Sequence, residues 1–365
     1  MDKPLRIGLV GAGAISGAYL DRLTVLESLE LVAVADLAPR RAKAVLERVS
    51  TAQTMDVDDL IAAPDVDLVL NLTVPQSHAE VALQAIAAGK SVYGEKPLAG
   101  TAADAATVLA AADRAGLVLG CAPDTVLGTG IQTARKAVDD GEIGTPIAAS
   151  ATMVTPGHEA WHPNPDFYYQ PGGGPLLDMG PYYLTALVTL LGPVARVTGA
   201  ATRTRDERVI GLGPRRGEVV PVDVDTHVTG VLEHRGGVLS TILMSFDAVG
   251  SKASRIEVHG ERGSLVVPDP NNFDGDVAVC RLGGNQWETL PVSAGYRDTG
   301  RGCGLADLAT ATPQRPPRAS GLLAYHVLDV MEQLLESAHT GTSLPVNSSV
   351  ERPEPVPLQD LARRV

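Results

Sequence analysis

The sequence predicts an α/β protein with two domains, a parallel-sheet domain followed by an α+β domain with a large, open, mostly antiparallel sheet. Three observations predict this fold. Short apolar runs alternate with helical patterns from residue 1 to about residue 120, which is typical of parallel β-α units. β-rich runs then fill 194–292, and an amphipathic helical pattern at 321–338 follows them.

The first domain is expected to span residues 1–124. Its strands are expected at 6–10, 29–36, 67–73, 91–94 and 117–121. Its helices are expected at 15–27, 39–49, 77–89 and 101–116. Gly89 is positioned to end the third of these helices, since glycine readily adopts the left-handed conformation found there.

The second domain is expected at 125–345, with a polar tail at 346–365. A helix at 126–141, a strand at 147–155, a Pro- and Gly-rich loop at 156–175 and a helix at 178–191 precede its β-rich part. A hairpin is expected to turn at residues 235–237. Because one face of this sheet is expected to be open, we expect a homodimer or homotetramer formed through it.

The charge of the chain argues against a nucleic-acid partner. The formal net charge is −13, and the basic residues form isolated pairs such as Arg40–Arg41 and Arg215–Arg216. Binding to phosphate backbones needs clustered Lys and Arg, so we expect no nucleic acid.

Cysteine usage and hydropathy indicate a cytoplasmic protein. The three cysteines are widely spaced and odd in number, which suits a reducing compartment. Glycines interrupt the apolar N-terminal stretch and no cleavage site follows it. No segment approaches the roughly 18 apolar residues of a membrane span, so we expect no membrane association. No His, Cys and carboxylate set has a recognised metal spacing, and no metal is expected.

A glycine-rich turn follows the first predicted strand. Gly11 permits the tight turn, Gly13 lets a pyrophosphate approach the backbone, and Ala14 and Ile15 lead into a helix whose N–H groups face that phosphate. The second strand ends in Asp36, at the separation expected for an acid that binds ribose. This combination predicts a Rossmann domain that binds a dinucleotide.

Asp36 favours NAD over NADP, because a carboxylate accepts hydrogen bonds from ribose hydroxyls and repels a 2′-phosphate. Arg40 and Arg41 lie nearby in sequence, and either is able to partner that phosphate. NADP therefore stays the less favoured alternative.

Three motifs together resemble the Gfo/Idh/MocA oxidoreductases, named after glucose–fructose oxidoreductase and inositol dehydrogenase. They are NLTVPQSH at 71–78, GKSVYGEKP at 89–97 and GGGPLLDMGPYY at 172–183. The resemblance covers nearly the whole chain. It implies a nicotinamide cofactor and substrates that are mainly sugars, cyclitols and related polyols. It further implies cofactor contacts by Thr73, Pro75, His78, Glu95 and Lys96.

Lys96 corresponds to the family lysine that contacts the reacting oxygen beside the nicotinamide. Alcohol oxidation needs a base for the hydroxyl proton and a cation near the developing alkoxide, and a lysine suits this chemistry. Pro97 restricts the backbone of the residue before it, so the lysine is expected to be held in place.

The family pattern continues with Asp, three residues and His on a helix. This chain has Asp178 but carries Tyr182 at the histidine position, as glucose–fructose oxidoreductase and dihydrodiol dehydrogenase types also do. A spacing of four places both side chains on one helical face. We expect Lys96, Tyr182 and Asp178 to be catalytic, with the proton acceptor undecided between Lys96 and Tyr182. Asp178 is alternatively a helix N-cap.

The aromatic loop over 158–174 is the candidate substrate wall. The chain is only 4% aromatic, yet this loop is rich in rings that stack on sugars and in side chains that bind hydroxyls. The expected substrate-binding residues are Asp124, Trp161, His162, Tyr168, Asp178 and Tyr182. Alternatively, the loop folds over its own small hydrophobic cluster.

The function expected from these features is that of an NAD-dependent sugar dehydrogenase. Tyr182 with the aromatic loop is similar to aldose dehydrogenases that act at C1 and yield a lactone. Oxidation of an inositol, cyclitol or glycoside ring hydroxyl is the alternative. A redox-neutral enzyme that retains its NAD, and a non-catalytic dinucleotide-sensing regulator, stay open; the latter predicts loss of the lysine, which is present.

Overall fold

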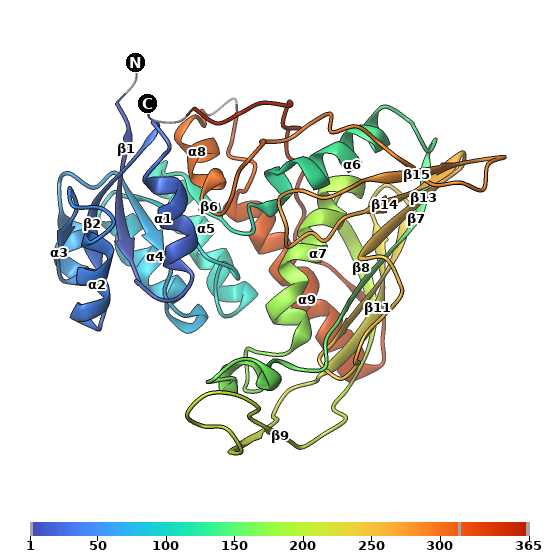
Figure 1. Cartoon of the computed structure of the whole chain (residues 1–365), viewed down its shortest axis with the longest axis horizontal. Helices are drawn as coiled ribbons and strands as arrows, with labels where there is room; N and C mark the ends of the chain where they lie inside the picture. Colours follow the sequence, from blue (N-terminus) through green and yellow to red (C-terminus); the bar gives the residue numbers. More distant parts are fainter. Residues whose placement is uncertain (1–2, 313–314, 363–365) are drawn as a thin grey trace. The chain divides into compact units, whose positions relative to one another are not determined.

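The computed structural model describes residues 3–312 and 315–362, which form two compact units (Figure 1). The first unit comprises the described residues of 1–132, 293–325 and 353–365, and the second comprises Thr133–Val292 and His326–Arg352. Each unit combines segments that are separated in sequence. The sequence, in contrast, predicts two continuous domains at 1–124 and 125–345. Residues 363–365 of the expected tail lie outside the described part of the chain.

The first unit contains a six-stranded parallel sheet of order β3-β2-β1-β4-β5-β6. Its strands are β1 (Leu5–Val10), β2 (Leu29–Ala35), β3 (Gln53–Thr54), β4 (Leu68–Asn71), β5 (Ser91–Gly94) and β6 (Leu119–Cys121). This order is that of a Rossmann fold, in which ligands bind beyond the carboxyl ends of the strands. The predicted α/β class and Rossmann domain are confirmed.

Helices flank this sheet, as Figure 1 shows for α1, α2, α4 and α5. The helices are α1 (Ser16–Leu23), α2 (Pro39–Leu46), α3 (Val57–Ala62), α4 (His78–Ala87), α5 (Ala102–Ala115) and α8 (Cys303–Ala309). Short 3₁₀ turns occupy Pro75–Ser77 and Thr125–Leu127. Helices α6 (Thr129–Asp139) and α9 (Gly321–Thr340) contain residues of both units. Strand β3 and helices α3 and α8 were not predicted from the sequence.

Local sequence explains where helices begin and end. The Thr101 hydroxyl accepts the Asp104 N–H at the start of α5, and Gly116 ends that helix in the left-handed conformation. Gly89 follows α4 with φ of 76°, as the sequence predicts. The central strands β1, β2 and β4 are almost entirely apolar and buried, which is typical of parallel strands covered on both faces.

The second unit contains a nine-stranded sheet of order β16-β15-β14-β13-β7-β12-β11-β8-β17. Its strands are β7 (Pro146–Val154), β8 (Val194–Thr202), β11 (His227–His234), β12 (Leu239–Ser245), β13 (Ile256–Gly260), β14 (Gly263–Val267), β15 (Ala278–Arg281), β16 (Glu288–Thr289) and β17 (Leu344–Pro345). Only β7 and β12 pair in parallel among these strands, so the predicted mostly antiparallel sheet is confirmed. A separate hairpin pairs β9 (Glu207–Val209) with β10 (Val219–Pro221).

Helices α7 (Pro175–Leu191) and α9 lie against one face of this sheet (Figure 1). Gly199 and Gly230 are directly opposite one another on β8 and β11. A Cβ at Gly199 would lie 2.3 Å from the Leu334 carbonyl oxygen, and one at Gly230 would lie 2.5 Å from the Leu334 Cδ1 atom. The paired glycines therefore allow α9 to approach the strands closely.

Helix α7 begins three residues before its predicted start. Its N-cap is Gly174, and the Asp178 N–H bonds to the Gly174 carbonyl. Asp178 consequently lies in the first turn and is not the N-cap. Pro181 is inside the helix, where it contributes no N–H to the i−4 carbonyl.

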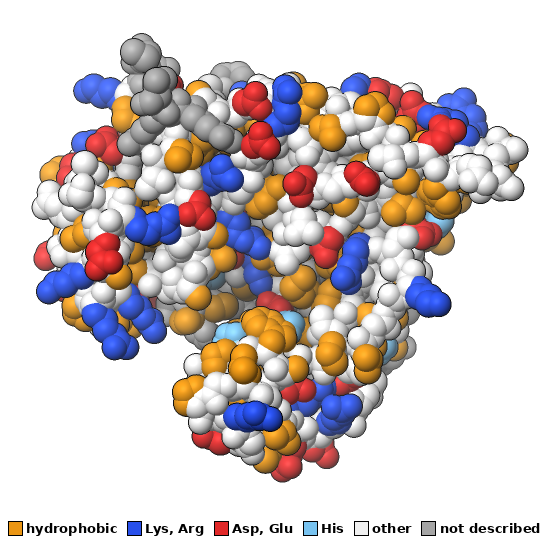
Figure 2. Space-filling model, in the orientation of Figure 1, with side chains coloured by type: hydrophobic (Ala, Val, Ile, Leu, Met, Phe, Trp, Pro, Cys, Tyr) orange, Lys and Arg blue, Asp and Glu red, His pale blue; other side chains and the backbone are white. Residues whose placement is uncertain are grey.

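Acidic and basic side chains are interspersed over the visible face of the molecule (Figure 2). Within residues 3–312 and 315–362, no helix is both long and apolar enough to cross a membrane. The expected homo-oligomer and cytoplasmic location stay predictions.

His326 on α9 is a fully buried histidine whose bonds suit the neutral ring. The Val194 N–H donates to its Nε2 atom at 3.1 Å, which leaves the ring proton on Nδ1, 2.8 Å from the Ser348 hydroxyl. Burial lowers the pKa of His326 to about 4. A second proton would remove the acceptor that the Val194 N–H needs.

We expect acid to destabilise the second unit through His326. Between the unfolded-state pKa of about 6.5 and the folded pKa of about 4, the unfolded chain binds a proton at this site that the folded chain does not. Stability therefore falls by up to roughly 3 kcal/mol as pH drops through this window, and the site contributes no pH dependence above it. Urea unfolding at pH 7, 6 and 5 measures this. His326→Gln should show a shallower loss on acidification; equal slopes for the two proteins would contradict the assignment.

Candidate functional site: a dinucleotide loop and an aromatic loop

The glycine loop follows β1 at the carboxyl edge of the parallel sheet. Gly11 has φ of 96°, and a Cβ there would lie 2.6 Å from the Leu72 carbonyl oxygen, so only glycine fits. A Cβ at Gly13 would meet nothing within 4 Å, which leaves its backbone open to a ligand. Ala14 is exposed and Ile15 is half-buried just before α1. This geometry fits a dinucleotide pyrophosphate at the start of α1.

Asp36 follows β2 and holds the glycine loop. Its Oδ2 atom accepts the Ala12 N–H at 2.8 Å, and its Oδ1 atom accepts the Ala38 N–H at 2.7 Å. A carboxylate has about four lone-pair sites, so both oxygens retain acceptor capacity for ribose hydroxyls. Arg40 is exposed in the first turn of α2.

His78 connects the turns that follow β4 and β5. Its ring nitrogens lie 2.6 Å from the Pro97 carbonyl and 3.1 Å from the Thr73 carbonyl, and the residue is 2% exposed. Thr73 donates its hydroxyl to Asn71 at 2.6 Å. His78 was expected to contact the cofactor, but both ring nitrogens contact the backbone instead. Its observed role is to hold the two turns together.

Glu95 anchors the turn that carries Lys96. Its Oε1 atom accepts the Tyr19 hydroxyl of α1 at 2.7 Å, and its Oε2 atom accepts the Lys96 N–H at 3.0 Å. Glu95 is 8% exposed, whereas Lys96 is half-buried. Because β1 and β5 are parallel strands of one sheet, this turn and the glycine loop lie at the same edge of the first unit.

Asp124 is fully buried and belongs to the framework of the first unit. Its Oδ2 atom accepts the N–H groups of Gly302 at 2.8 Å and Gly304 at 3.0 Å, where α8 begins. Burial raises the pKa of this carboxyl group. Asp124 was expected to bind a substrate hydroxyl, but it has no exposed surface on which to do so. The sequence did not reveal α8, which uses this carboxylate.

The aromatic loop between β7 and α7 forms a cluster of rings. It contains 3₁₀ turns at His158–Ala160 and Asp166–Tyr168. His162 contacts the rings of Trp161, Phe167 and Tyr168 at centroid distances of 5.4–5.5 Å. Trp161 is nevertheless 54% exposed and Phe167 is 52% exposed. The loop therefore packs on itself, as the alternative holds, and also presents aromatic surface.

A buried guanidinium holds this loop against other segments of the second unit. Arg208, with a side chain 1% exposed, pairs with Glu159 at 3.0 Å and also with Asp247. Tyr169 donates its hydroxyl to Glu159, and burial raises the pKa of that hydroxyl. The network joins the loop to β9 and to the end of β12. Sequence reasoning missed it, because no local pattern marks an arginine of an isolated hairpin as buried.

Asp178 and Tyr182 lie one helical turn apart in α7, about 6 Å along its axis. The Asp178 carboxylate contacts the His158 ring, with 3.1 Å between Oδ2 and Nε2. The Asp178 side chain is 19% exposed and Tyr182 is 5% exposed. Tyr183, the next residue of the helix, is fully buried in the core. His158 was absent from the expected site, although it begins the loop that the sequence analysis singled out.

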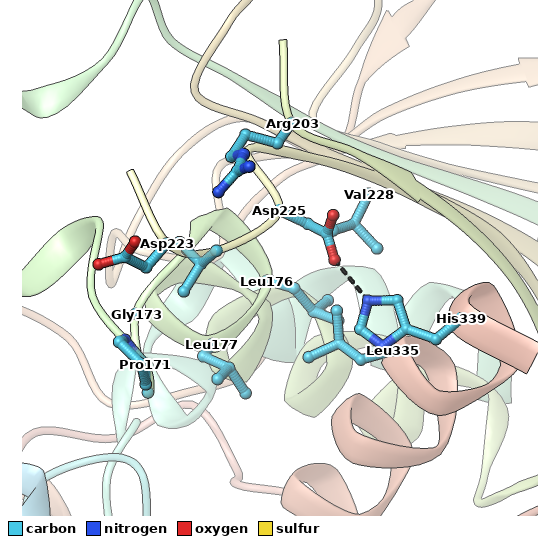
Figure 3. Close-up of a pocket in the computed structure, with 13 residues that line it drawn as sticks. Pro171, Gly173, Leu176, Leu177, Arg203, Asp223, Asp225, Val228, Leu335 and His339 are labelled. Atoms are coloured by element: carbon cyan, nitrogen blue, oxygen red, sulfur yellow. Dashed lines mark hydrogen bonds and ion pairs between the residues drawn. The ribbon is translucent and has the colours of Figure 1, made fainter. Parts of the chain in front are cut away.

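A pocket of about 400 Å³ adjoins the first turn of α7 in the second unit. In the view of Figure 3, the leucines Leu176, Leu177 and Leu335 lie below Arg203, Asp223 and Asp225. Asp225 and His339 form an ion pair at 2.7 Å on its wall. None of the expected substrate-binding residues lines this pocket. Among the described residues, no group of three or more His, Cys, Asp or Glu is arranged to hold a metal.

The Rossmann order and the open glycine loop define a dinucleotide-dependent class of protein. Residues 5–122 match the family model described as an oxidoreductase family with an NAD-binding Rossmann fold. Residues 131–266 match the GFO/IDH/MocA C-terminal domain. The chain belongs to the Gfo/Idh/MocA family and is an oxidoreductase with an NAD-binding type of Rossmann domain.

Curated relatives align over most of the chain. A dTDP-3,4-didehydro-2,6-dideoxy-α-D-glucose 3-reductase of Saccharopolyspora spinosa is 30% identical over 327 residues, covering 85% of this chain and 92% of the relative. A myo-inositol 2-dehydrogenase of Thermotoga maritima is 28% identical over 263 residues, covering 72% and 74%.

Solved structures share the fold. An NAD-binding oxidoreductase from Klebsiella pneumoniae superposes with a TM-score of 0.81 at 24% identity, covering 95% of this chain and all of that one. Levoglucosan dehydrogenase in complex with NADH and L-sorbose gives 0.79 at 21% identity, with coverage of 95% and 100%.

We expect Arg208→Met to destabilise the protein strongly. Removing the guanidinium leaves the carboxylates of Glu159 and Asp247 buried without their partner, which costs about 3–5 kcal/mol. Arg215→Met is the matched control, because Arg215 pairs with Asp166 at the surface of the same unit. Urea unfolding measures both variants. Equal losses for the two would contradict a structural role of the buried network.

Proposed function

We propose that this protein is an NAD-dependent dehydrogenase of a sugar or polyol, in which Lys96 and Tyr182 take the proton of the hydroxyl that is oxidised. The observation that carries the proposal is the anchoring of Lys96. The Glu95 carboxylate fixes the Lys96 backbone and is itself held by Tyr19, at the sheet edge where the glycine loop lies. A cation held there is suited to an alkoxide that forms beside a bound dinucleotide.

The substrate class is supported by the aromatic loop and by the names of relatives. Trp161 exposes a large ring and Tyr168 is partly exposed, and aromatic faces stack well on sugar rings. Relatives are named for myo-inositol, a dTDP-deoxysugar and 1,5-anhydro-D-fructose. We propose an aldose oxidised at C1 to a lactone as the first candidate. A cyclitol or glycoside ring hydroxyl is the second, favoured by the inositol dehydrogenases among the relatives.

The proposed chemistry divides among a few side chains. A bound nicotinamide supplies the acceptor for the hydride. The hydroxyl proton passes to the Lys96 amine, directly or through the Tyr182 phenol, and the ammonium that forms stabilises negative charge on the substrate oxygen. Asp178, one turn before Tyr182, accepts a substrate hydroxyl and orients the ring.

For the cofactor, the proposal assigns the pyrophosphate to the loop from Gly11 to Ile15 and the adenosine ribose to Asp36. Asp36 is already bound to Ala12 of that loop, so the acid and the phosphate site form one rigid structure. A 2′-phosphate beside this carboxylate would be repelled, so NAD is preferred. Arg40 is exposed, and by pairing with a 2′-phosphate it is able to reduce the preference for NAD.

Lys96→Met should abolish most turnover while NAD still binds. The wild-type protein is tested with NAD and a panel of aldoses, inositols and glycosides, and NADH formation is followed by absorbance. We expect the variant to lower kcat by about 10²-fold or more, because the cation and proton acceptor are lost. Lys43→Met, at an exposed position of α2, is the control and should match wild type. Saturable NAD binding by the wild type with no turnover of any substrate would refute the dehydrogenase proposal.

Asp36→Ala should reduce the preference for NAD over NADP. Because Asp36 also accepts the Ala12 N–H, the variant is expected to bind both cofactors less tightly. The informative quantity is therefore the ratio of kcat/KM for NAD to that for NADP, which should fall about ten-fold or more. Asp21→Ala, which removes an exposed partner of Arg48, should leave the ratio unchanged. An unchanged ratio in Asp36→Ala would remove Asp36 from cofactor selection.

A further inference from the structure

An imidazole from the aromatic loop meets the first turn of α7. The His158 Nε2 atom lies 3.1 Å from the Asp178 Oδ2 atom, although the residues are 20 positions apart. His158 is 7% exposed. The contact lies within the second unit and joins two segments whose proximity no sequence motif indicates.

The ring of His158 is held by neighbours on several sides. It packs against Trp161, Tyr168 and Phe246, with centroid distances of 5.1, 4.3 and 4.4 Å. The His158 backbone N–H donates to the Tyr169 hydroxyl at 3.1 Å. The imidazole is therefore a fixed group rather than a mobile surface side chain.

The position of the ring proton follows from the partners of the two nitrogens. Within the described part of the chain, the Nδ1 atom of His158 is buried and has no hydrogen-bond partner. A neutral ring with its proton on Nε2 donates to the Asp178 carboxylate and leaves only a lone pair at Nδ1. The other tautomer would direct a lone pair at the carboxylate and bury an N–H without an acceptor, which is costly.

We propose that His158 is a positioning residue for the reaction, acting by donating its Nε2–H to Asp178. This inference rests on the proposed function, in which Asp178 contacts the substrate. An Asp178 oxygen that accepts from His158 still has acceptor capacity for a substrate hydroxyl. His158 thus fixes the carboxylate that orients the sugar one turn before Tyr182.

The first test separates the donated hydrogen bond from ring packing. His158→Phe keeps an aromatic ring of similar size and removes the donor, and His158→Gln retains an N–H near the Nε2 position. We expect His158→Phe to lower kcat/KM for the sugar about ten-fold, with KM for NAD unchanged. His158→Gln should recover most of this loss. A variant His158→Gln as impaired as His158→Phe would overturn the inference.

A double-mutant cycle then tests whether His158 acts through Asp178. Asp178→Asn removes the charged acceptor, so adding His158→Phe should cause little further loss in kcat/KM. Losses that multiply in the double variant would overturn the inference. His234→Phe is the control for losing a buried histidine. His234 bonds to the Gly192 carbonyl, about 20 Å further along α7, and its loss should lower stability without changing KM for the sugar.

A spectroscopic readout keeps the inference separate from the proposed function. Nitrogen NMR of ¹⁵N-histidine-labelled wild-type protein at alkaline pH, where histidine is neutral, reports the tautomer without turnover. We expect a protonated Nε2 and a bare Nδ1 for His158, assigned by loss of the signals in His158→Gln. The opposite tautomer would overturn the inference even if the protein oxidises sugars. If the expected tautomer is found but no substrate is turned over, the hydrogen bond from His158 to Asp178 is upheld. The positioning role of His158 in a reaction and the proposed function are then both overturned.

Discussion

The packing of the aromatic loop in the second unit depends on the Arg208 guanidinium. Burying two carboxylates is costly unless a cation and further hydrogen bonds compensate, and here Arg208 serves both Glu159 and Asp247. Glu159 directly follows His158 and also accepts the Tyr169 hydroxyl. The same interaction that neutralises the buried acids therefore fixes both ends of the ring cluster, so the surface presented to a ligand is rigid before anything binds.

Carboxylates organise the first unit in a similar way, but with neutral donors. Glu95 accepts a tyrosine hydroxyl and a backbone N–H, and Asp36 accepts two backbone N–H groups. Such bonds to a charged acceptor are stronger than neutral ones. They tie the turns after β1, β2 and β5 to one another. As a result, the glycine loop and the turn that carries Lys96 are both hydrogen-bonded to neighbouring segments at the sheet edge.

Much of the fold was predictable because its signals are local. Apolar strands, the glycine loop and Asp36 lie close in sequence, and each predicts structure within its own segment. α8 was missed because its start depends on Asp124, about 180 residues earlier in the chain. The same limit applies to the site. The spacing of Asp178 and Tyr182 predicts that they share one helical face, whereas His158 reaches Asp178 only through tertiary packing.

The contact between His158 and Asp178 bears on the role of Tyr182, which stands where the family pattern has histidine. The family pattern places an imidazole one turn after the aspartate, and this chain places a phenol there. A phenol is protonated near neutral pH, so it takes the substrate proton only if it gives up its own to a base such as Lys96, and this transfer needs accurate placement of the substrate. The second unit supplies an imidazole to Asp178 from the aromatic loop, with 3.1 Å between His158 Nε2 and Asp178 Oδ2. Under the proposed function, the second unit therefore contributes both orientation by Asp178 and, together with Lys96, proton transfer by Tyr182.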